Sequence, residues 1–214
     1  MELPVILLTN GVLLPGASLK LPIRSKTNVS TVDRLIKNGQ ALRQEVVIAY
    51  RIDEEKVYEI ATLAYIDQLQ YWSYNLHVQY SLNVFGTCRV KLDKLNLPMA
   101  TVSILEDSLD SIKADSITQL TGIAKRISGF SSEANNVIQN VLDGSSSPGM
   151  IVDVCASQCR SQSYTEVLDF LGQVDVEKRI CTLKSWVKKV DIKRQSTPTS
   201  QQSAVSKMSP RNLG

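Results

Sequence analysis

Apolar and polar residues alternate along several stretches of the first half of the chain. The clearest stretch runs from Leu76 to Val84, where every second residue is apolar. A period of two predicts a β-strand with one buried face and one solvent-facing side. Gln44 to Tyr50 contains a denser apolar run, which predicts a strand buried on both faces. Shorter matches predict further strands at Leu3–Leu8, Leu19–Ile23, Ile60–Ile66 and Ala100–Ile104.

One short helix is predicted within this β-rich region. Ser30 can serve as its N-cap, and Asp33 follows three residues later in a capping-box arrangement. Gly39 is placed to end the helix. The side chains that would then face inward are those of Val32, Leu35 and Ile36. About six strands around one helix predict a small, strongly bent sheet or pseudo-barrel.

Beyond about residue 110 the apolar period changes from two to about 3.6, which is typical of amphipathic helices. One apolar stripe ends at Gly129 and a second ends at Gly144. The first stripe comprises Ile117, Leu120, Ile123, Ala124 and Ile127, and the second comprises Val137, Ile138, Val141 and Leu142.

Capping residues mark the remaining helices. The Ser147-Pro148 pair suits the N-cap and first position of a third helix. Ser163 and Glu166 form a capping box for a fourth helix, which ends at Gly172. The last helix begins at Asp175. Its predicted inner face is Ile180, Leu183, Val187 and Val190, and its predicted outer face is Lys178, Arg179, Lys184, Lys188 and Lys189.

The pattern divides the chain into three parts and predicts an α+β fold. Residues 1–108 form the β-rich part, and residues 109–190 form a helical bundle. Residues 191–214 are rich in Ser, Gln, Thr, Pro and Lys and nearly empty of large apolar side chains. Such a segment cannot bury enough apolar surface to offset the entropy of ordering, so we expect a disordered polar tail.

The composition is that of an ordinary soluble globular protein, with 43% hydrophobic and 21% charged residues. A net charge of +3 is too small to indicate nucleic acid as a partner. No apolar run approaches the ~20 residues of a membrane helix, and the start lacks the basic region of a secretory signal. The four scattered cysteines therefore indicate free thiols in a reducing, intracellular compartment.

Candidate chemical sites are few. Cys155 and Cys159 would share one helix face, as two zinc ligands could, but the only histidine is His77 and no Cys-x-x-Cys pair occurs. We interpret both cysteines as small apolar packing residues. Neither a Gly-x-x-x-x-Gly-Lys nucleotide loop nor a Gly-x-Ser-x-Gly nucleophile elbow is present. The sequence therefore predicts no catalytic residue, no metal and no cofactor.

Three aromatic residues stand out because they are close together at a predicted turn between two strands. These residues are Tyr71, Trp72 and Tyr74. Aromatic side chains bury a large area and can anchor a binding partner. Two interpretations stay open from the pattern alone: an exposed binding cluster, or side chains that fold over the end of the sheet into the core.

Four segments carry a family resemblance through their order and spacing. Leu3 to Gly16 runs from a short strand through Thr-Asn-Gly to Val-Leu-Leu-Pro-Gly. The other three segments are 61–66 (Ala-Thr-Leu-Ala-Tyr-Ile), 85–90 (Phe-Gly-Thr-Cys-Arg-Val) and 174–180 (Val-Asp-Val-Glu-Lys-Arg-Ile). Together they resemble the opening, a Gly-Thr-Leu-Ala-x-Ile strand, a Gly-x-x-Arg turn and the start of the final helix in the N-terminal domain of Lon-type ATP-dependent proteases. The match looks closest to the peroxisomal Lon branch, although Ala61 replaces the family's usual glycine.

The resemblance implies a PUA-like β-domain followed by a helical bundle, which captures unfolded or damaged polypeptides and assists assembly of a hexameric ring. The ATPase and Ser–Lys protease segments that follow in the family are not in this sequence, so no catalytic role transfers to any position. As the apolar surface that contacts substrate we predict Leu13, Leu14, Tyr71, Trp72 and Tyr74.

Two alternatives belong to other functional classes. A free-standing domain of this kind could act as an adaptor or regulator that joins full-length Lon or associates with itself. An RNA-binding role rests only on analogy with other PUA-like folds. The expected location is intracellular, in the peroxisomal matrix or the cytoplasm, and the final Asn212-Leu213-Gly214 does not match a Ser-Lys-Leu peroxisomal signal.

Overall fold

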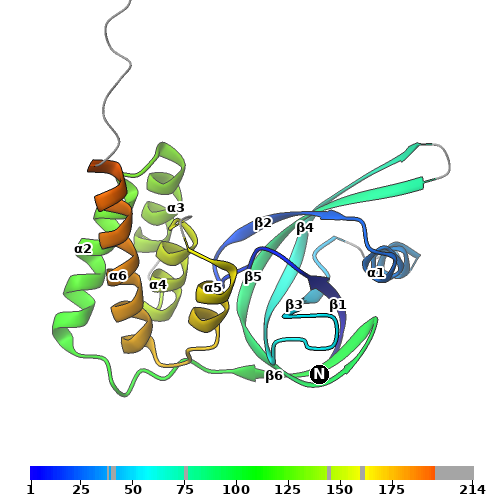
Figure 1. The fold of residues 1–214 in the computed structure, drawn as a ribbon, viewed down its shortest axis with the longest axis horizontal. Coiled ribbons are helices and arrows are strands. Elements are labelled where there is room, and N and C mark those ends of the chain that lie inside the picture. Colours follow the sequence, from blue (N-terminus) through cyan, green and yellow to red (C-terminus); the bar gives the residue numbers. More distant parts are fainter. Residues whose placement is uncertain (38, 40–41, 75–76, 144–145, 160–161, 196–214) are drawn as a thin grey trace, which may run out of the picture.

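The first half of the chain folds into a mixed β-sheet that closes on itself. The computed structural model describes residues 1–214 except 38, 40–41, 75–76, 144–145, 160–161 and 196–214. The sheet order is β2-β5-β4-β3-β1-β6, and an additional β5–β6 pairing closes the barrel (Figure 1). Among the strands of the described residues, only the β1–β3 pair is parallel. The strands are β1 (Glu2–Leu8), β2 (Ser18–Ile23), β3 (Glu45–Tyr50), β4 (Ile60–Tyr74), β5 (His77–Asn96) and β6 (Met99–Leu105).

Bends in the two longest strands allow this closure. The β4–β5 register shifts between Leu63 and Ala64 and again between Ile66 and Gln68, and the β5–β6 register shifts between Leu92 and Lys94. Such irregularities bend a strand and increase its twist. The predicted strands at 60–66 and 76–84 were therefore too short, because β4 and β5 continue through these bends. The Gly-x-x-Arg segment lies inside β5 and not at a turn.

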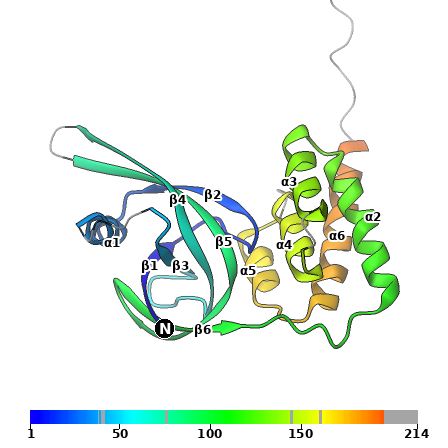
Figure 2. The same cartoon turned by 180° about the vertical axis from the view of Figure 1, so that it is seen from behind.

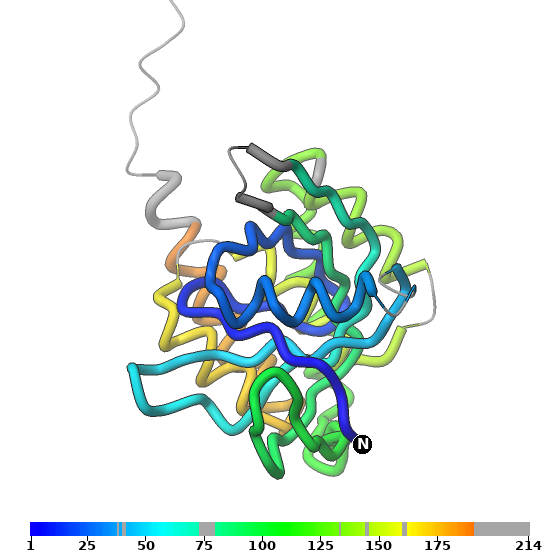
Figure 3. Tube along the Cα trace, turned by 90° about the vertical axis from the view of Figure 1, so that its right-hand side faces the viewer, coloured from blue at the N-terminus to red at the C-terminus, as the bar shows by residue number. Residues whose placement is uncertain are grey.

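Helix α1 (Lys26–Lys37) lies across the barrel face turned away from the other helices, as Figure 3 shows. The predicted start at Ser30 was wrong, because the Ser25 hydroxyl accepts the Asn28 N–H at 3.2 Å and opens the helix earlier. The apolar pattern did not predict the first turn, because its buried face is polar. The Asn28 side-chain oxygen accepts from the Leu7 N–H, and the Asn28 side-chain NH₂ donates to the Leu7 carbonyl. Ile36, predicted to face inward, is 38% exposed.

Helices form the second half of the described chain. The predicted caps at Ser147 and Ser163 are confirmed, since Ser147 accepts from the Met150 N–H and Ser163 forms a full capping box with Glu166. Ile117 was wrongly predicted to be buried, because it lies at the exposed edge of its stripe. The Gly144 stop lies outside the described residues. The helices are α2 (Ala114–Ser128), α3 (Ser132–Asp143), α4 (Pro148–Ser157), α5 (Tyr164–Leu171) and α6 (Val176–Gln195).

Figures 1 and 2 show two lobes side by side: a barrel lobe (residues 2–105) and a helical lobe (residues 114–195). The dense run Val46-Val47-Ile48 is fully buried, as its pattern predicted, because both faces of β3 are covered. In the helical lobe the rings of Phe170 and Trp186 pack with centroids 5.0 Å apart. The predicted α+β architecture, a bent barrel with one helix followed by a helical bundle, is confirmed. Of the predicted tail, residues 191–195 are helical, and 196–214 lie outside the described residues.

Candidate functional site

The distal parts of β4 and β5 form a hairpin that projects beyond the barrel (Figures 1 and 2). Two of the predicted aromatic residues lie on it with large exposed fractions, 72% for Tyr71 and 48% for Trp72. The side chain of Tyr74 lies outside the described residues. Aromatic side chains often serve as binding anchors, and these two lie on a projecting element, so this hairpin is the first candidate site.

The hairpin aromatics do not form one cluster. Neighbouring residues on a strand point to opposite faces, so Tyr71 and Trp72 lie on opposite sides of the hairpin. Tyr71 pairs with Tyr80 and shares a face with Leu69, whereas Trp72 pairs with Gln79. Leu69 is partly buried and packs on the core, so the Tyr71 face continues the barrel's apolar surface outward. The hairpin can therefore offer a separate aromatic contact on each face.

The base of the hairpin is tied to α1. The Tyr80 hydroxyl donates a hydrogen bond to the Asp33 carboxylate, and this bond, aided by burial, raises the pKa of Tyr80 to about 12. The phenol therefore stays protonated at neutral pH and keeps donating. This contact holds the hairpin's inner end in place while its outer end stands free of the barrel.

Leu13 and Leu14 lie elsewhere, in the loop between β1 and β2. Their side chains are 1% and 2% exposed, so they contribute to the core, and both residues also line the cleft described below. The Leu13 carbonyl accepts hydrogen bonds from the hydroxyls of Tyr50 at 2.9 Å and Thr62 at 2.6 Å. Burial raises the pKa of Tyr50, which keeps its hydroxyl a donor. The loop is thus bound to the barrel by its backbone.

Close backbone approach also fixes this loop. A side chain at Gly86 would lie 2.6 Å from the Leu14 carbonyl oxygen, so only glycine leaves room for the loop to cross β5. Because β2 pairs Ser18 with Phe85 and Ile23 with Tyr80, the loop and the hairpin lie at opposite ends of β2. The structure therefore separates the predicted site residues into a buried pair and an exposed hairpin.

A cleft of about 870 Å³ is lined by residues of the β1–β2 loop, α3, α4 and α5 and of the segments that join these helices. Its described lining includes apolar side chains such as Val12, Leu19 and Val167 beside polar ones such as Asn140 and Gln158. No Asp, Glu, Lys, Arg or His is among the described residues that line it. Such a lining suits binding of an uncharged group and offers no acid–base pair for catalysis.

The two lobes are joined by a buried ionic cluster of Arg89, Asp107, Asp153 and Arg179. Arg89 on β5 donates to both oxygens of Asp153 at 2.6 and 2.8 Å, and to the Leu171 carbonyl at 2.8 Å. Arg179 on α6 donates to the same carboxylate at 2.7 Å and pairs with Asp107. Gly149 gives Asp107 its space, because a methyl group there would collide with that carboxylate.

This cluster was missed from the sequence. Arg179 was predicted to lie on the outer face of the last helix, but its side chain is fully buried. Burial alone would lower the pKa of Arg179, but the charges of Asp153 and Asp107 outweigh it and raise that pKa. Its spacing of three from Val176 and four from Leu183 placed it on the apolar stripe, and that signal could have revealed it.

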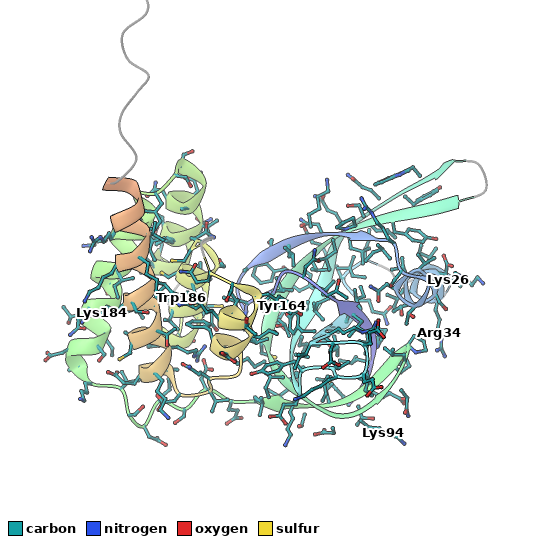
Figure 4. All side chains as sticks on the ribbon, in the orientation of Figure 1. Lys26, Arg34, Lys94, Tyr164, Lys184 and Trp186 are labelled. Atoms are coloured by element: carbon teal, nitrogen blue, oxygen red, sulfur yellow. The ribbon has the colours of Figure 1, made fainter. Side chains whose placement is uncertain are left out.

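Figure 4 shows Tyr164 of α5 reaching toward the barrel lobe, where its hydroxyl donates to the Arg51 carbonyl at 3.2 Å. The β6–α2 linker adds a second tie, since the Ser108 N–H donates to the Val174 carbonyl and its own carbonyl accepts from the Val176 N–H. The lobes therefore meet through hydrogen bonds and charge pairs as well as apolar packing.

Cys155 and Cys159 are buried in the helical lobe's core. Burial raises the pKa of Cys155 to about 12, so its thiol is a poor nucleophile and a poor metal ligand at neutral pH. Among the described residues, no group of three or more His, Cys, Asp or Glu side chains is placed to hold a metal ion. None of the described helices is both long and apolar enough to cross a membrane.

Two named nematode proteins are similar in sequence to most of this chain. The chain is 41% identical over 195 residues to "Lon protease homolog 2, peroxisomal" of Caenorhabditis briggsae, a match covering 87% of this chain. It is 40% identical over 190 residues, again 87% of the chain, to the protein of the same name from Caenorhabditis elegans. The matched region spans 24%, about a quarter, of the length of each relative.

Solved structures share the fold. The N-terminal domain of a Mycobacterium avium complex Lon protease superposes with a TM-score of 0.67 at 18% identity, covering 88% of this chain and 98% of that one. A Lon N-terminal domain protein from Xanthomonas campestris gives a TM-score of 0.61 at 19% identity, covering 87% and 98%. The family model of the ATP-dependent protease La (LON) substrate-binding domain matches residues 2–189. The chain therefore belongs to the family of Lon substrate-binding domains.

Proposed function

We propose that this chain is the non-catalytic substrate-capturing domain of a Lon-type ATP-dependent protease, and that it binds unfolded or damaged polypeptides. Family membership supports the general role. The observation that supports the hairpin as the binding surface is the exposure of Tyr71 and Trp72 on this projecting element. Unfolded chains expose apolar side chains that folded proteins bury, and aromatic anchors on a projecting element can reach them.

Capture at this surface is weak for a single copy and tolerant of sequence, because it depends on a few aromatic contacts and no deep pocket. Several copies held together would raise the avidity without any new contact. We propose that the ring that the family resemblance implies holds several copies of this domain together and raises their avidity for one substrate chain in this way.

The test compares binding of reduced, carboxymethylated lysozyme, a permanently unfolded chain, to wild-type protein and to three variants. Tyr71→Ala and Trp72→Ala should each raise the Kd by about 5- to 30-fold, the effect of losing an aromatic anchor worth ~1–2 kcal/mol. Ile104→Ala is the matched control, because Ile104 is a large apolar residue 58% exposed on β6, opposite Val90 and far along β5 from the hairpin.

All three variants should keep the wild-type unfolding midpoint, since exposed substitutions change stability by roughly ±0.5 kcal/mol. Unchanged affinity in both hairpin variants would remove the hairpin from the binding surface. Equal loss in Ile104→Ala would show that any exposed apolar residue contributes and that no defined site exists.

We also propose a peroxisomal location, which the names of the two similar nematode proteins support. Fluorescence imaging of the tagged protein against a peroxisomal matrix marker tests it, and a diffuse cytoplasmic signal would contradict it.

A further inference from the structure

The outer edge of β4 is unpaired over the hairpin. Strand β3 pairs with β4 only as far as Glu45 opposite Tyr65. One step further, the Ile66 N–H donates to the Gln44 carbonyl at 3.1 Å, and the Ile66 carbonyl accepts from the Arg43 N–H at 2.8 Å. Within the described part of the chain, no strand pairs with that edge from Asp67 onward, while β5 pairs with the opposite edge throughout.

The backbone direction along this edge follows from Ile66. Its N–H and C=O point away from β5, so Ile66 and its partner Val84 form a pair without mutual hydrogen bonds. Such pairs alternate with hydrogen-bonded pairs along an antiparallel ladder. On β5, the residues that follow Val84 in pairs without mutual hydrogen bonds are therefore Leu82 and Tyr80. Their partners Leu69 and Tyr71 therefore direct their N–H and C=O groups toward the open edge.

This edge lacks the features that normally protect exposed strands. Proteins guard such edges with charged side chains, especially lysine, and with proline. The other open edge of the barrel, on β2, carries both guards, in the exposed residues Lys20 and Pro22. Residues 68–72 (Gln-Leu-Gln-Tyr-Trp) contain no proline and no charge. Two of these residues are aromatic, and aromatic residues on an open edge favour pairing with another chain.

We propose that the β4 edge at residues 68–72 accepts an extended segment of the unfolded substrate as an added strand. This inference rests on the proposed function and specifies how the substrate is recognised. The guest's backbone pairs with the outward N–H and C=O groups of Leu69 and Tyr71, which gives affinity without a sequence requirement. Residues 68–72 carry no charge that would favour guest segments of one charge sign over the other.

Amide hydrogen exchange, read by NMR on the 214-residue chain, tests this directly. With unfolded carboxymethylated lysozyme occupying nine-tenths of the protein, the amides of Leu69 and Tyr71 should exchange about tenfold more slowly than in free protein. The amides of Gln70 and Trp72 face β5 and serve as internal controls, with little change expected. Tight binding without slower exchange at Leu69 and Tyr71 would overturn strand addition and leave side-chain capture intact.

A pair of variants separates backbone from side chain. Tyr71→Pro and Tyr71→Ala both remove the aromatic ring, but only proline also removes the outward N–H, a loss that an edge strand tolerates. Tyr71→Pro should bind the unfolded chain about tenfold more weakly than Tyr71→Ala, the equivalent of one hydrogen bond. Equal affinities, with unfolding midpoints that match, would contradict the proposal.

Two further outcomes are decisive. If wild-type protein does not bind the unfolded chain at all, the proposed function fails and strand addition fails with it. If sedimentation shows that the chain dimerises and the Leu69 and Tyr71 amides are already protected in the dimer, the edge pairs with a second copy and the proposed guest is wrong.

Discussion

At the scale of single residues, Asp153 is the centre of the lobe junction, because its carboxylate pairs with two guanidinium groups. Arg89 comes from the barrel lobe and Arg179 from the helical lobe, and all three side chains are buried. A buried ion pair adds little net stability over apolar packing, but removing one partner leaves uncompensated charge and is strongly destabilising. The cluster therefore fixes which surfaces of the lobes meet.

Asp153→Asn should lower the free energy of unfolding by about 3–5 kcal/mol, because two buried arginines lose the buried carboxylate that they share and keep only the partly exposed Asp107. Urea denaturation followed by far-UV circular dichroism measures it. Lys178→Ala is the matched control, since Lys178 adjoins Arg179 on α6 but has a side chain 74% exposed, and its effect should stay near zero. Equal midpoints for the two variants would show that the cluster does not hold the lobes.

Single residues were also where sequence prediction failed most often. Hydrophobic periodicity assigns polar residues to the surface, so it misplaced Arg179 and missed Asn28, which are buried because each has specific hydrogen-bond or charge partners. Those partners come from distant segments, and no local pattern encodes them. By contrast, the caps at Ser147 and Ser163 were predicted correctly, because a cap depends only on residues within one turn.

At the scale of elements, the β1–β2 loop joins the barrel to α4. Gly16 has φ of +74°, and an added side chain would meet Met150 and would lie 2.6 Å from Val154 on that helix. Gly11 in the same loop has φ of +71°, but nothing lies within 4 Å of an added side chain. The two glycines therefore share a positive φ, which would strain any other residue, and differ in their contact with the helical lobe.

Gly16→Ala should destabilise the protein by about 1–3 kcal/mol more than Gly11→Ala, the usual cost of overpacking. Thermal or urea unfolding of both variants measures the difference in stability. Placing alanine at a positive φ costs about the same at both positions, so this contribution cancels in the comparison. If the two alanines cost the same, α4 can shift without penalty and the loop does not fix the position of the helical lobe.

The N-terminus of α6 supplies a pH-dependent contact. Asp175 accepts hydrogen bonds from the Ser111 hydroxyl and from the Glu177 and Lys178 N–H groups, which hold its pKa below the usual range. A lowered pKa means that this stabilisation is present above the unfolded-state pKa and is lost as pH falls through the folded-state value.

Asp175→Asn keeps an acceptor at the cap but does not titrate. Between about pH 5 and pH 3, the urea midpoint of the wild type should therefore fall more steeply than that of Asp175→Asn. Parallel declines would mean that Asp175 contributes nothing that depends on its charge.

The apolar pattern predicted helices and strands well where the element has a buried face, and poorly where both faces of the element are exposed. The strand positions in the barrel followed from alternation, whereas β4 beyond Ile66 has exposed residues on both faces and shows no period to detect. Its strand conformation comes from pairing with β5, a tertiary effect. The most informative part of the candidate site was thus visible as a group of aromatic residues but not as a projecting hairpin.

At the scale of the whole molecule, the two lobes lie side by side and the hairpin projects from the barrel lobe (Figure 1). The change of period near residue 110 predicted both lobes, but not the ionic cluster that joins them or the cleft between them. Leu13 and Leu14 are buried, whereas Tyr71 and Trp72 are exposed, and this exposure supports our proposal that the hairpin contacts a partner.

The most direct test of the account is a titration of this chain with the same protein in two states, native lysozyme and reduced, carboxymethylated lysozyme, followed by fluorescence anisotropy. The account predicts saturable binding of the unfolded form, with an affinity that changes little between low and high salt because the contacts are apolar and backbone-mediated. It predicts no binding of the native form. Equal binding of both states, or of neither, would contradict the claim that this domain recognises unfolded polypeptide.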